Sequence, residues 1–238
     1  MAIYLPELDP VQLTFPPVEQ ALSQPDGLLA MGGDLSADRL LLAYQSSIFP
    51  WFSEGDPLLW WSPAARAVFS PDSIKFNRTL RKKWQRGELS LTLNQAFSEV
   101  IQGCAAPRKN QPHTWILPPM QHAYQRLHQQ GHAHSIEVWQ HSELVGGLYG
   151  IAVGGLFCGE SMFNRVPDAA KFALLALQQH IRHFAPGWID CQLPNPFLQQ
   201  LGAETMSRSH YLNLLQQQVK ISSPAGHWQP TTLSLRNE

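Results

Sequence analysis

The segment between residues 133 and 193 constrains the fold most, because short apolar runs separated by turns give way to a helical period. Ser135–Trp139, Leu144–Ile151 and Leu156–Gly159 predict a meander of antiparallel strands. Six of the chain's 16 glycines lie between 144 and 159. Since glycine weakens a strand, we expect these glycines to mark bulges or close approaches of the backbone to a ligand.

A helix and a further strand follow this meander. Leu174, Leu177 and Ile181 lie at three- and four-residue spacing, and they mark the buried stripe of a helix from about Asp168 to Phe184. Trp188–Leu193 then predicts a strand. A strand, a helix and a strand in this order form a right-handed crossover between parallel strands. We therefore predict an α+β fold with an acetyltransferase-like (GNAT-like) mixed sheet.

The first 70 residues differ from the rest because they are rich in proline. Proline removes a backbone donor, so loops and short elements are expected here around one helix, from about Ser36 to Ser46. We predict a small N-terminal domain at 1–70 and a catalytic domain at 71–238. In the latter, a helix is expected at about Leu93–Cys104, and the chain from Ser222 onward is expected to be loosely ordered.

Charge and cysteine content narrow the function classes. The net charge is -1, so any binding of nucleic acid must come from a local patch and not from a whole basic face. The three cysteines form no disulfide framework, which favours a reducing compartment. The chain shows no signal peptide at its start and no apolar run long enough to span a membrane. We expect a cytoplasmic protein that binds no membrane.

One local patch of positive charge stands out between residues 75 and 86. Six basic residues lie within these twelve positions, with no acid among them. Lysine and arginine that neutralise phosphates bind nucleic acid in a salt-dependent way. The alternative is an ordinary solvated helix face.

Polar residues in the last strand of the crossover predict a site. Side chains alternate between the faces of a strand, so Asp190 and Gln192 are expected on one face. Glu160 lies at the end of the preceding strand, and the carboxyl ends of parallel strands meet at one edge of a sheet. We therefore expect Glu160 to approach Asp190. The alternative is that Asp190 caps a helix or pairs with an arginine.

Two further groups of residues have a functional and a structural interpretation. Trp51 and Trp115 lie in loop-rich segments, where aromatic rings can stack on bases or can fill the interface between domains. His132 and His134 share a strand face, but no nearby residue completes a set of metal ligands, so no metal is expected.

An acyl-coenzyme A acetyltransferase has a crossover of this kind. Such an enzyme cradles a pyrophosphate with a glycine-rich loop at the start of a helix. The connection Asn164–Asp168 contains no glycine, and Asp168 places negative charge where the phosphate would bind. Coenzyme A is therefore not expected, although the fold is similar.

Several motifs in order resemble the leucyl/phenylalanyl-tRNA–protein transferase family, over about residues 25 to 215. The matching stretches are Gly27–Ser36, Ile48–Phe52, Trp60–Pro63, Thr114–Ile116, Gly131–Trp139, Leu144–Gly150, Phe157–Phe163 and Ile189–Gln192. The resemblance implies an enzyme that moves leucine or phenylalanine, less often methionine, from aminoacyl-tRNA to proteins that begin with arginine or lysine. The product is then marked for degradation. No cofactor is implied, and a monomer is expected.

The resemblance also implies roles for individual residues. Asp190 and Gln192 would handle the proton and orient the amine, and Glu160 would hold the incoming amino group or the basic acceptor. Substitution of Asp190 by alanine would then spare the fold and cripple transfer. The residues that would line the pocket for the transferred amino acid are Leu148, Phe157, Gly159, Met162, Leu174, Ile181 and Ile189. Trp51 and Trp115 would hold the terminal adenosine, and Arg78, Lys82, Lys83 and Arg86 would meet the acceptor stem.

Some positions depart from the family pattern, among them Ser47, Leu148 and the helix start Asp168–Lys171. These departures bear on selectivity and tRNA affinity and not on the reaction. Two other classes stay open: a coenzyme A-dependent N-acetyltransferase and a non-catalytic module that binds tRNA or peptides.

Overall fold

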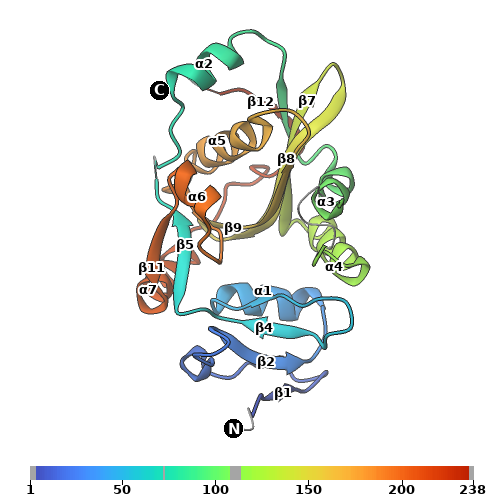
Figure 1. Cartoon of the computed structure of the whole chain (residues 1–238), viewed down its shortest axis with the longest axis vertical. Helices are drawn as coiled ribbons and strands as arrows, with labels where there is room; N and C mark the ends of the chain where they lie inside the picture. Colours follow the sequence, from blue (N-terminus) through green and yellow to red (C-terminus); the bar gives the residue numbers. More distant parts are fainter. Residues whose placement is uncertain (1–3, 72, 108–113, 236–238) are drawn as a thin grey trace.

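The computed structural model describes residues 4–71, 73–107 and 114–235. It contains one large mixed sheet and one small sheet (Figure 1). In order, the strands of the large sheet are β11 (Glu204–Ser207), β5 (Ala65–Phe69), β10 (Trp188–Asp190), β9 (Leu156–Asn164), β8 (Glu143–Val153), β7 (Ala133–Gln140), β6 (Ser90–Leu93) and β12 (Thr231–Leu233). Those of the small sheet are β1 (Glu7–Leu8), β2 (Leu28–Gly32), β4 (Leu59–Trp61) and β3 (Phe49–Pro50). The predicted α+β class and the mixed sheet are confirmed.

The meander of β7, β8 and β9 forms the centre of the large sheet, as predicted. One of its glycines marks a bulge, as expected, because the pairing register of β8 and β9 shifts between Tyr149 and Gly150. At Gly150 a β-carbon would lie 2.1 Å from the carbonyl oxygen of Cys158, so only glycine fits there. The shift leaves Glu160 without a partner on β8, since Tyr149 pairs with Ser161 and Gly150 with Gly159.

Helices cover both faces of the large sheet (Figure 1). They are α1 (Ala37–Gln45), α2 (Arg78–Trp84), α3 (Phe97–Ala105), α4 (Pro118–Gln129), α5 (Ala169–Ile181), α6 (Pro196–Leu201) and α7 (Arg208–Gln218), with a short 3-10 turn at Val18–Gln20. Successive residues of β8 point to opposite faces, so Leu148 packs with α5 while Tyr149 packs with α3 and α4. Each face of the sheet therefore has its own apolar core.

The small sheet lies next to the face that carries α3 and α4 (Figure 1). Helix α1 begins after Ser36, whose hydroxyl accepts a hydrogen bond from the backbone of Arg39, so the predicted cap is confirmed. Leu40 and Tyr44 of α1 share one apolar core with Tyr124 of α4. The division of the chain after residue 70 stays a proposal. In the structure, β5 crosses this region as a member of the large sheet.

Two local expectations were wrong. The helix expected from Leu93 begins only at Phe97, because Ser90–Leu93 pairs with β7 as a strand and Asn94 then turns the backbone with a positive φ. The segment from Ser222 is not loose: β12 pairs with β6, and the ring of Trp228 stacks on His134. None of the helices in the described ranges has the length and apolar character needed to cross a membrane.

Candidate active site

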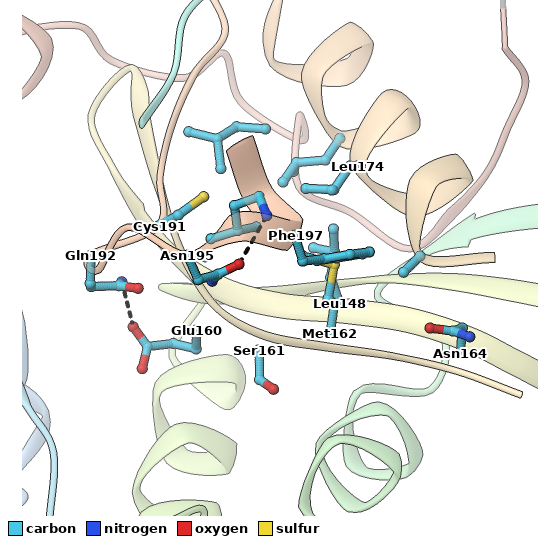
Figure 2. A pocket seen from close by; sticks show the side chains of 15 residues that line it. Leu148, Glu160, Ser161, Met162, Asn164, Leu174, Cys191, Gln192, Asn195 and Phe197 are labelled. Carbon is cyan, nitrogen blue, oxygen red and sulfur yellow. Dashed lines mark hydrogen bonds between the residues drawn. The ribbon is translucent and has the colours of Figure 1, made fainter. Parts of the chain in front are cut away.

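A cavity of about 410 Å³ opens between β9, α5 and the chain that follows β10. Its lining residues are Leu148, Gly159, Glu160, Ser161, Met162, Asn164, Ala170, Leu174, Leu177, Ile189, Cys191, Gln192, Asn195, Phe197 and Leu198. Figure 2 shows Glu160 and Gln192 facing each other at one end, with Leu148, Met162 and Phe197 gathered beside them. The cavity is large enough for an amino-acid side chain and has a polar end and an apolar end.

A split in the sheet creates this cavity. Strand β10 pairs in parallel with β9 only from Trp188 to Asp190. Beyond Asp190 the chain stays hydrogen-bonded to β5, since the amide of Cys191 donates to the carbonyl of Ala67 and the carbonyl of Gln192 accepts from its amide. Strand β9 meanwhile continues to Asn164 beside β8. Side chains that follow each diverging strand therefore face the gap.

Gln192 does not continue the strand alternation. Its φ is +55°, a left-handed conformation that ends the strand. The side chain therefore enters the cavity, and its amide donates a hydrogen bond of 3.2 Å to Oε1 of Glu160 (Figure 2). The predicted approach of Glu160 to the last strand is thus made through Gln192.

Asp190 points away from the cavity and is fully buried. It accepts two hydrogen bonds from the guanidinium of Arg66, at 2.8 and 2.7 Å, one of 3.0 Å from the hydroxyl of Tyr211, and one of 3.0 Å from the backbone amide of Gln192. Four donors occupy the two oxygens of a carboxylate, which keeps the charged form satisfied. Of the two interpretations that the sequence left open for Asp190, pairing with an arginine is the one present in the structure.

Arg66 is the partner of Asp190 in this buried ion pair. Its guanidinium lies 5.0 Å from the ring centre of Phe49 and 4.5 Å from that of Tyr211, so aromatic rings exclude water from the pair. Burial acts to lower the pKa of Arg66, but the charge of Asp190 raises it above its ordinary value. The pair therefore stays ionised, and it fixes the turn that carries Gln192.

Glu160 is the acid that faces the cavity. Among the described residues that line it, Glu160 alone has a carboxylate. Its Oε2 accepts a hydrogen bond of 2.7 Å from the hydroxyl of Tyr124. Burial raises the pKa of Glu160 to about 7, although the hydroxyls of Tyr124 and Tyr44 act in the opposite direction. A carboxylate with such a pKa can exchange a proton with an amine near neutral pH.

The comparison with protein families shows which family the chain belongs to. Residues 68–216 match the model of the family described as leucyl/phenylalanyl-tRNA protein transferase, and residues 33–64 match the model of its N-terminal domain. The chain belongs to this transferase family. The resemblance seen in the sequence motifs is thereby confirmed.

Curated relatives cover the whole chain. The leucyl/phenylalanyl-tRNA–protein transferase of Psychromonas ingrahamii is 48% identical over 237 residues, which span 100% of both chains. That of Colwellia psychrerythraea is 50% identical and spans 99% of this chain and 100% of the relative. That of Shewanella pealeana is 53% identical, over 87% of this chain and 88% of the relative. The likeness to the transferase family is therefore not confined to one domain.

Most of the residues predicted to form the amino-acid pocket line the cavity. They are Leu148, Gly159, Met162, Leu174 and Ile189. Phe157 and Ile181 do not, because both are buried in the core that α5 shares with the sheet, where Phe157 packs near Trp228. Ala170, Leu177 and Phe197 line the cavity and were missed as wall residues. A signal for Leu177 existed, since it follows Leu174 by three residues on the same helix face.

The two predicted adenosine-binding tryptophans lie outside the cavity lining. Trp51 is 41% exposed, and its ring centre lies 5.5 Å from that of Trp61. Trp115 is partly buried against the core shared by α3, α4 and the small sheet. A role for Trp51 and Trp115 with nucleotide stays a prediction.

The predicted tRNA-binding residues lie on and after α2. Arg78, Lys82 and Arg86 are exposed, whereas Lys83 is partly buried and forms an ion pair of 2.6 Å with Asp168. Leu80 and Trp84 attach the other face of the helix to the core around α5. Three of the four cations are thus free to meet a phosphate backbone, while Lys83 also holds α2 to the start of α5.

The start of α5 is already occupied by charge. Asp168, at the N-cap, pairs with Lys83 and, at 2.8 Å, with Lys171. Its carboxylate makes no hydrogen bond to the backbone of the first turn of the helix, but it places negative charge beside the position that a pyrophosphate would take. The absence of a coenzyme A site stays a prediction.

Proposed function

We propose that this chain is an aminoacyltransferase that moves leucine or phenylalanine, and less readily methionine, from aminoacyl-tRNA to proteins that begin with arginine or lysine. The observation that carries the proposal is the cavity of a transferase-family chain that joins an apolar wall to a single carboxylate. The wall suits the transferred side chain, and the carboxylate suits the amine that attacks. Neither a metal nor a cofactor is part of the proposal, since the ester of an aminoacyl-tRNA is already activated.

The chemistry needs one group that accepts a proton. The α-ammonium of the acceptor protein has a pKa of about 7.7–8.0, and it must lose a proton before it can attack. We assign this proton to Glu160. The neutral amine then forms a bond to the ester carbonyl carbon, the ester C–O bond breaks, and a second proton from the nitrogen passes to the leaving ribose oxygen. General base assistance of this kind contributes about 10²–10⁴-fold.

Gln192 and Asp190 support this step in different ways. Gln192 orients the carboxylate of Glu160 through its hydrogen bond and lies where it can also contact the amine. Asp190 acts indirectly. It accepts a hydrogen bond from the backbone amide of Gln192 and pairs with Arg66, and both contacts hold the turn that carries Gln192. The three residues expected to be catalytic therefore stay together in the proposal, with Glu160 as the proton acceptor.

The same geometry supports the preference for a basic N-terminal residue. Arg66 neutralises Asp190, so Glu160 is the carboxylate left to attract a cation at this end of the cavity. Selection for the transferred residue comes from the apolar wall, and a hydrophobic pocket separates side chains that differ by one methylene by about 10–200-fold. We propose that the aminoacyl-tRNA is held by Arg78, Lys82 and Arg86, with Trp51 and Trp115 near its terminal adenosine.

The cellular consequences follow from the reaction. The product carries a large apolar residue at its N-terminus, which in this family marks proteins for degradation. We propose that the enzyme works in the cytoplasm, where aminoacyl-tRNA is found. None of the three cysteines is assigned to a disulfide, which is compatible with a reducing compartment.

The decisive experiment is transfer of labelled leucine from Leu-tRNA to a peptide that begins with arginine. We expect labelled peptide, and none when the peptide begins with aspartate or when its α-amine is acetylated. Absence of transfer to the arginine peptide would contradict the proposal. The two other classes give different results: an acetyltransferase would bind acetyl-coenzyme A in calorimetry, and a binding module would retain tRNA without turnover.

A further inference from the structure

A chain of hydrogen bonds runs from the small-sheet region into the cavity. The hydroxyl of Tyr44 on α1 is hydrogen-bonded to that of Tyr124 on α4, the hydroxyl of Tyr124 donates to Glu160 at 2.7 Å, and Gln192 donates to the same carboxylate at 3.2 Å. Both tyrosines are fully buried. Three segments far apart in the sequence thus meet at one carboxylate.

The number of protons fixes the direction of this chain. Each phenol has one proton, and that of Tyr124 is donated to Glu160. Tyr124 therefore has none left for Tyr44, so Tyr44 must be the donor in the bond between the two hydroxyls. When Glu160 is ionised, every proton in the chain has an acceptor.

Protonation of Glu160 disturbs this arrangement. While the amide of Gln192 donates to Oε1, an added proton sits on Oε2 and donates to Tyr124. Tyr124 would then turn its own proton to Tyr44, and the proton of Tyr44 would lose the acceptor that the described structure gives it. A buried donor without an acceptor is unfavourable. The two phenols therefore favour the ionised carboxylate.

We propose that Tyr124, and through it Tyr44, are positioning residues that favour the ionised form of Glu160, which accepts the proton of the incoming amine. This inference rests on the proposed function. Without the phenols, burial in the apolar cavity would protonate Glu160 near neutral pH. The chain also links the small-sheet region to the reaction, because Tyr44 is the contribution of α1 to the site.

Six titratable or charged groups interact with Glu160, the two phenols among them. They are Tyr44 from α1, Arg66 from β5, Tyr124 from α4, Tyr149 from β8, Cys158 from β9 and Asp190 from β10. Arg66 and Asp190 neutralise each other. Burial raises the pKa of Cys158 and of Tyr149, so both are neutral near pH 7. Tyr44 and Tyr124 are therefore, together with the amide of Gln192, the neutral donors that favour the charge of Glu160.

The test is the pH dependence of kcat/KM for leucine transfer to an arginine peptide. In Tyr124→Phe we expect the acidic limb to move upward by about one pH unit, so transfer at pH 6 falls about 10-fold while transfer at pH 9 is nearly unchanged. Tyr44→Phe should shift the limb in the same direction by less. Tyr149→Phe is the matched control, because this buried phenol also lies near Glu160 but has no hydrogen-bond partner among the described residues.

The proposal would be overturned if the acidic limb of the kcat/KM profile lay at the same pH in Tyr124→Phe, in Tyr149→Phe and in the unaltered enzyme. A second measurement covers the case in which Tyr124→Phe does not fold. The titration of Glu160 is followed by NMR on glutamate labelled with ¹³C, with Glu160→Gln to assign the signal, in the unaltered enzyme and in Tyr44→Phe. An unchanged titration in Tyr44→Phe would also contradict the inference. This measurement needs no substrate, so it distinguishes failure of the hydrogen-bond chain from failure of the proposed reaction.

Discussion

Asp190 and Arg66 are 124 positions apart, and their contact is the residue-scale feature that most changes the view of the site. Strand alternation placed the side chains of Asp190 and Gln192 on one face. The left-handed backbone at Gln192 instead sends its side chain into the cavity and leaves Asp190 on the opposite side. Glu160 consequently becomes the acid that a substrate can reach.

This buried pair leads to a prediction about stability. Removal of one partner leaves an uncompensated buried charge, so Asp190→Ala should lower the free energy of unfolding by about 3–5 kcal/mol. The double variant Asp190→Leu with Arg66→Met should recover most of this loss, because it removes both charges. Urea unfolding measures both effects. An Asp190→Ala protein as stable as the unaltered one, as the sequence alone suggested, would show that the pair contributes little.

At the scale of elements, α5 shows how one helix face separates the pocket from the core. Leu174 lines the cavity, whereas Ile181, two turns further along the same helix, is buried in the core. The hydrophobic stripe of a helix marks both, since periodicity reports burial and not which neighbour covers the residue. Only the position of the split between β9 and β10 tells the two apart.

Matched substitutions on α5 test this distinction. Leu174→Val removes a methylene from the wall, and it should favour phenylalanine over leucine in transfer by up to about 10-fold. Ile181→Val removes a methylene from the core, so it should leave this ratio unchanged while costing about 0.5–1.5 kcal/mol of stability. The ratio of kcat/KM for the two aminoacyl-tRNAs checks both. Equal effects of the two substitutions on this ratio would contradict the assignment of Leu174 to the pocket wall.

Helix α2 leads to the prediction on tRNA. Arg78 and Lys82 are exposed, so Arg78→Ala with Lys82→Ala should weaken tRNA binding and lower the slope of log K against log salt by about 2. Arg126→Ala with Lys220→Ala is the control, because it removes two exposed cations from other elements. Measurement of tRNA binding at several salt concentrations distinguishes the two double variants. Equal slopes for both double variants would exclude α2 as the tRNA contact.

At the scale of the whole molecule, the last described segment closes the face that carries α5. Trp228 stacks on His134 at 4.1 Å between ring centres, and His227 stacks on His180 at 3.9 Å. Burial lowers the pKa of His134 to about 3 and that of His180 to about 4. Both rings are therefore neutral in the folded chain at pH values where an unfolded chain binds protons.

The consequence is a loss of stability in mild acid. Below the ordinary histidine pKa of about 6.5 the unfolded chain takes up more protons, so stability falls as pH decreases from 6.5 toward 4. We expect a Tm at pH 5 that is lower than at pH 7 by on the order of 4 °C or more. His134→Gln should reduce this difference, whereas His122→Gln, at an exposed position, should not. Glu160 has a raised pKa and acts in the opposite direction, but it is common to all variants. An equal pH effect on Tm in all three proteins would contradict the assignment.

Much of this architecture was predictable because local patterns determine it. The meander, the crossover helix and the capped helix at Ser36 follow from alternation, helical spacing and capping. The family motifs, in turn, predicted the reaction and placed Glu160, Met162 and Leu174 at the cavity. The pairing of the segment after Ser222 was not predictable, since its partners β6 and His134 lie far away in the sequence.

The sequence by itself therefore determined the kinds of element, the mixed sheet, the family and several of the residues that line the cavity. The tertiary structure alone decided which of these residues face the cavity. Arg66, which lies 124 positions away along the chain, pairs with Asp190, and two phenols from separate helices form a chain of hydrogen bonds that ends on Glu160. The physical reason is that the energy of a buried charge depends on its neighbours in space, and no local pattern along the chain records those neighbours.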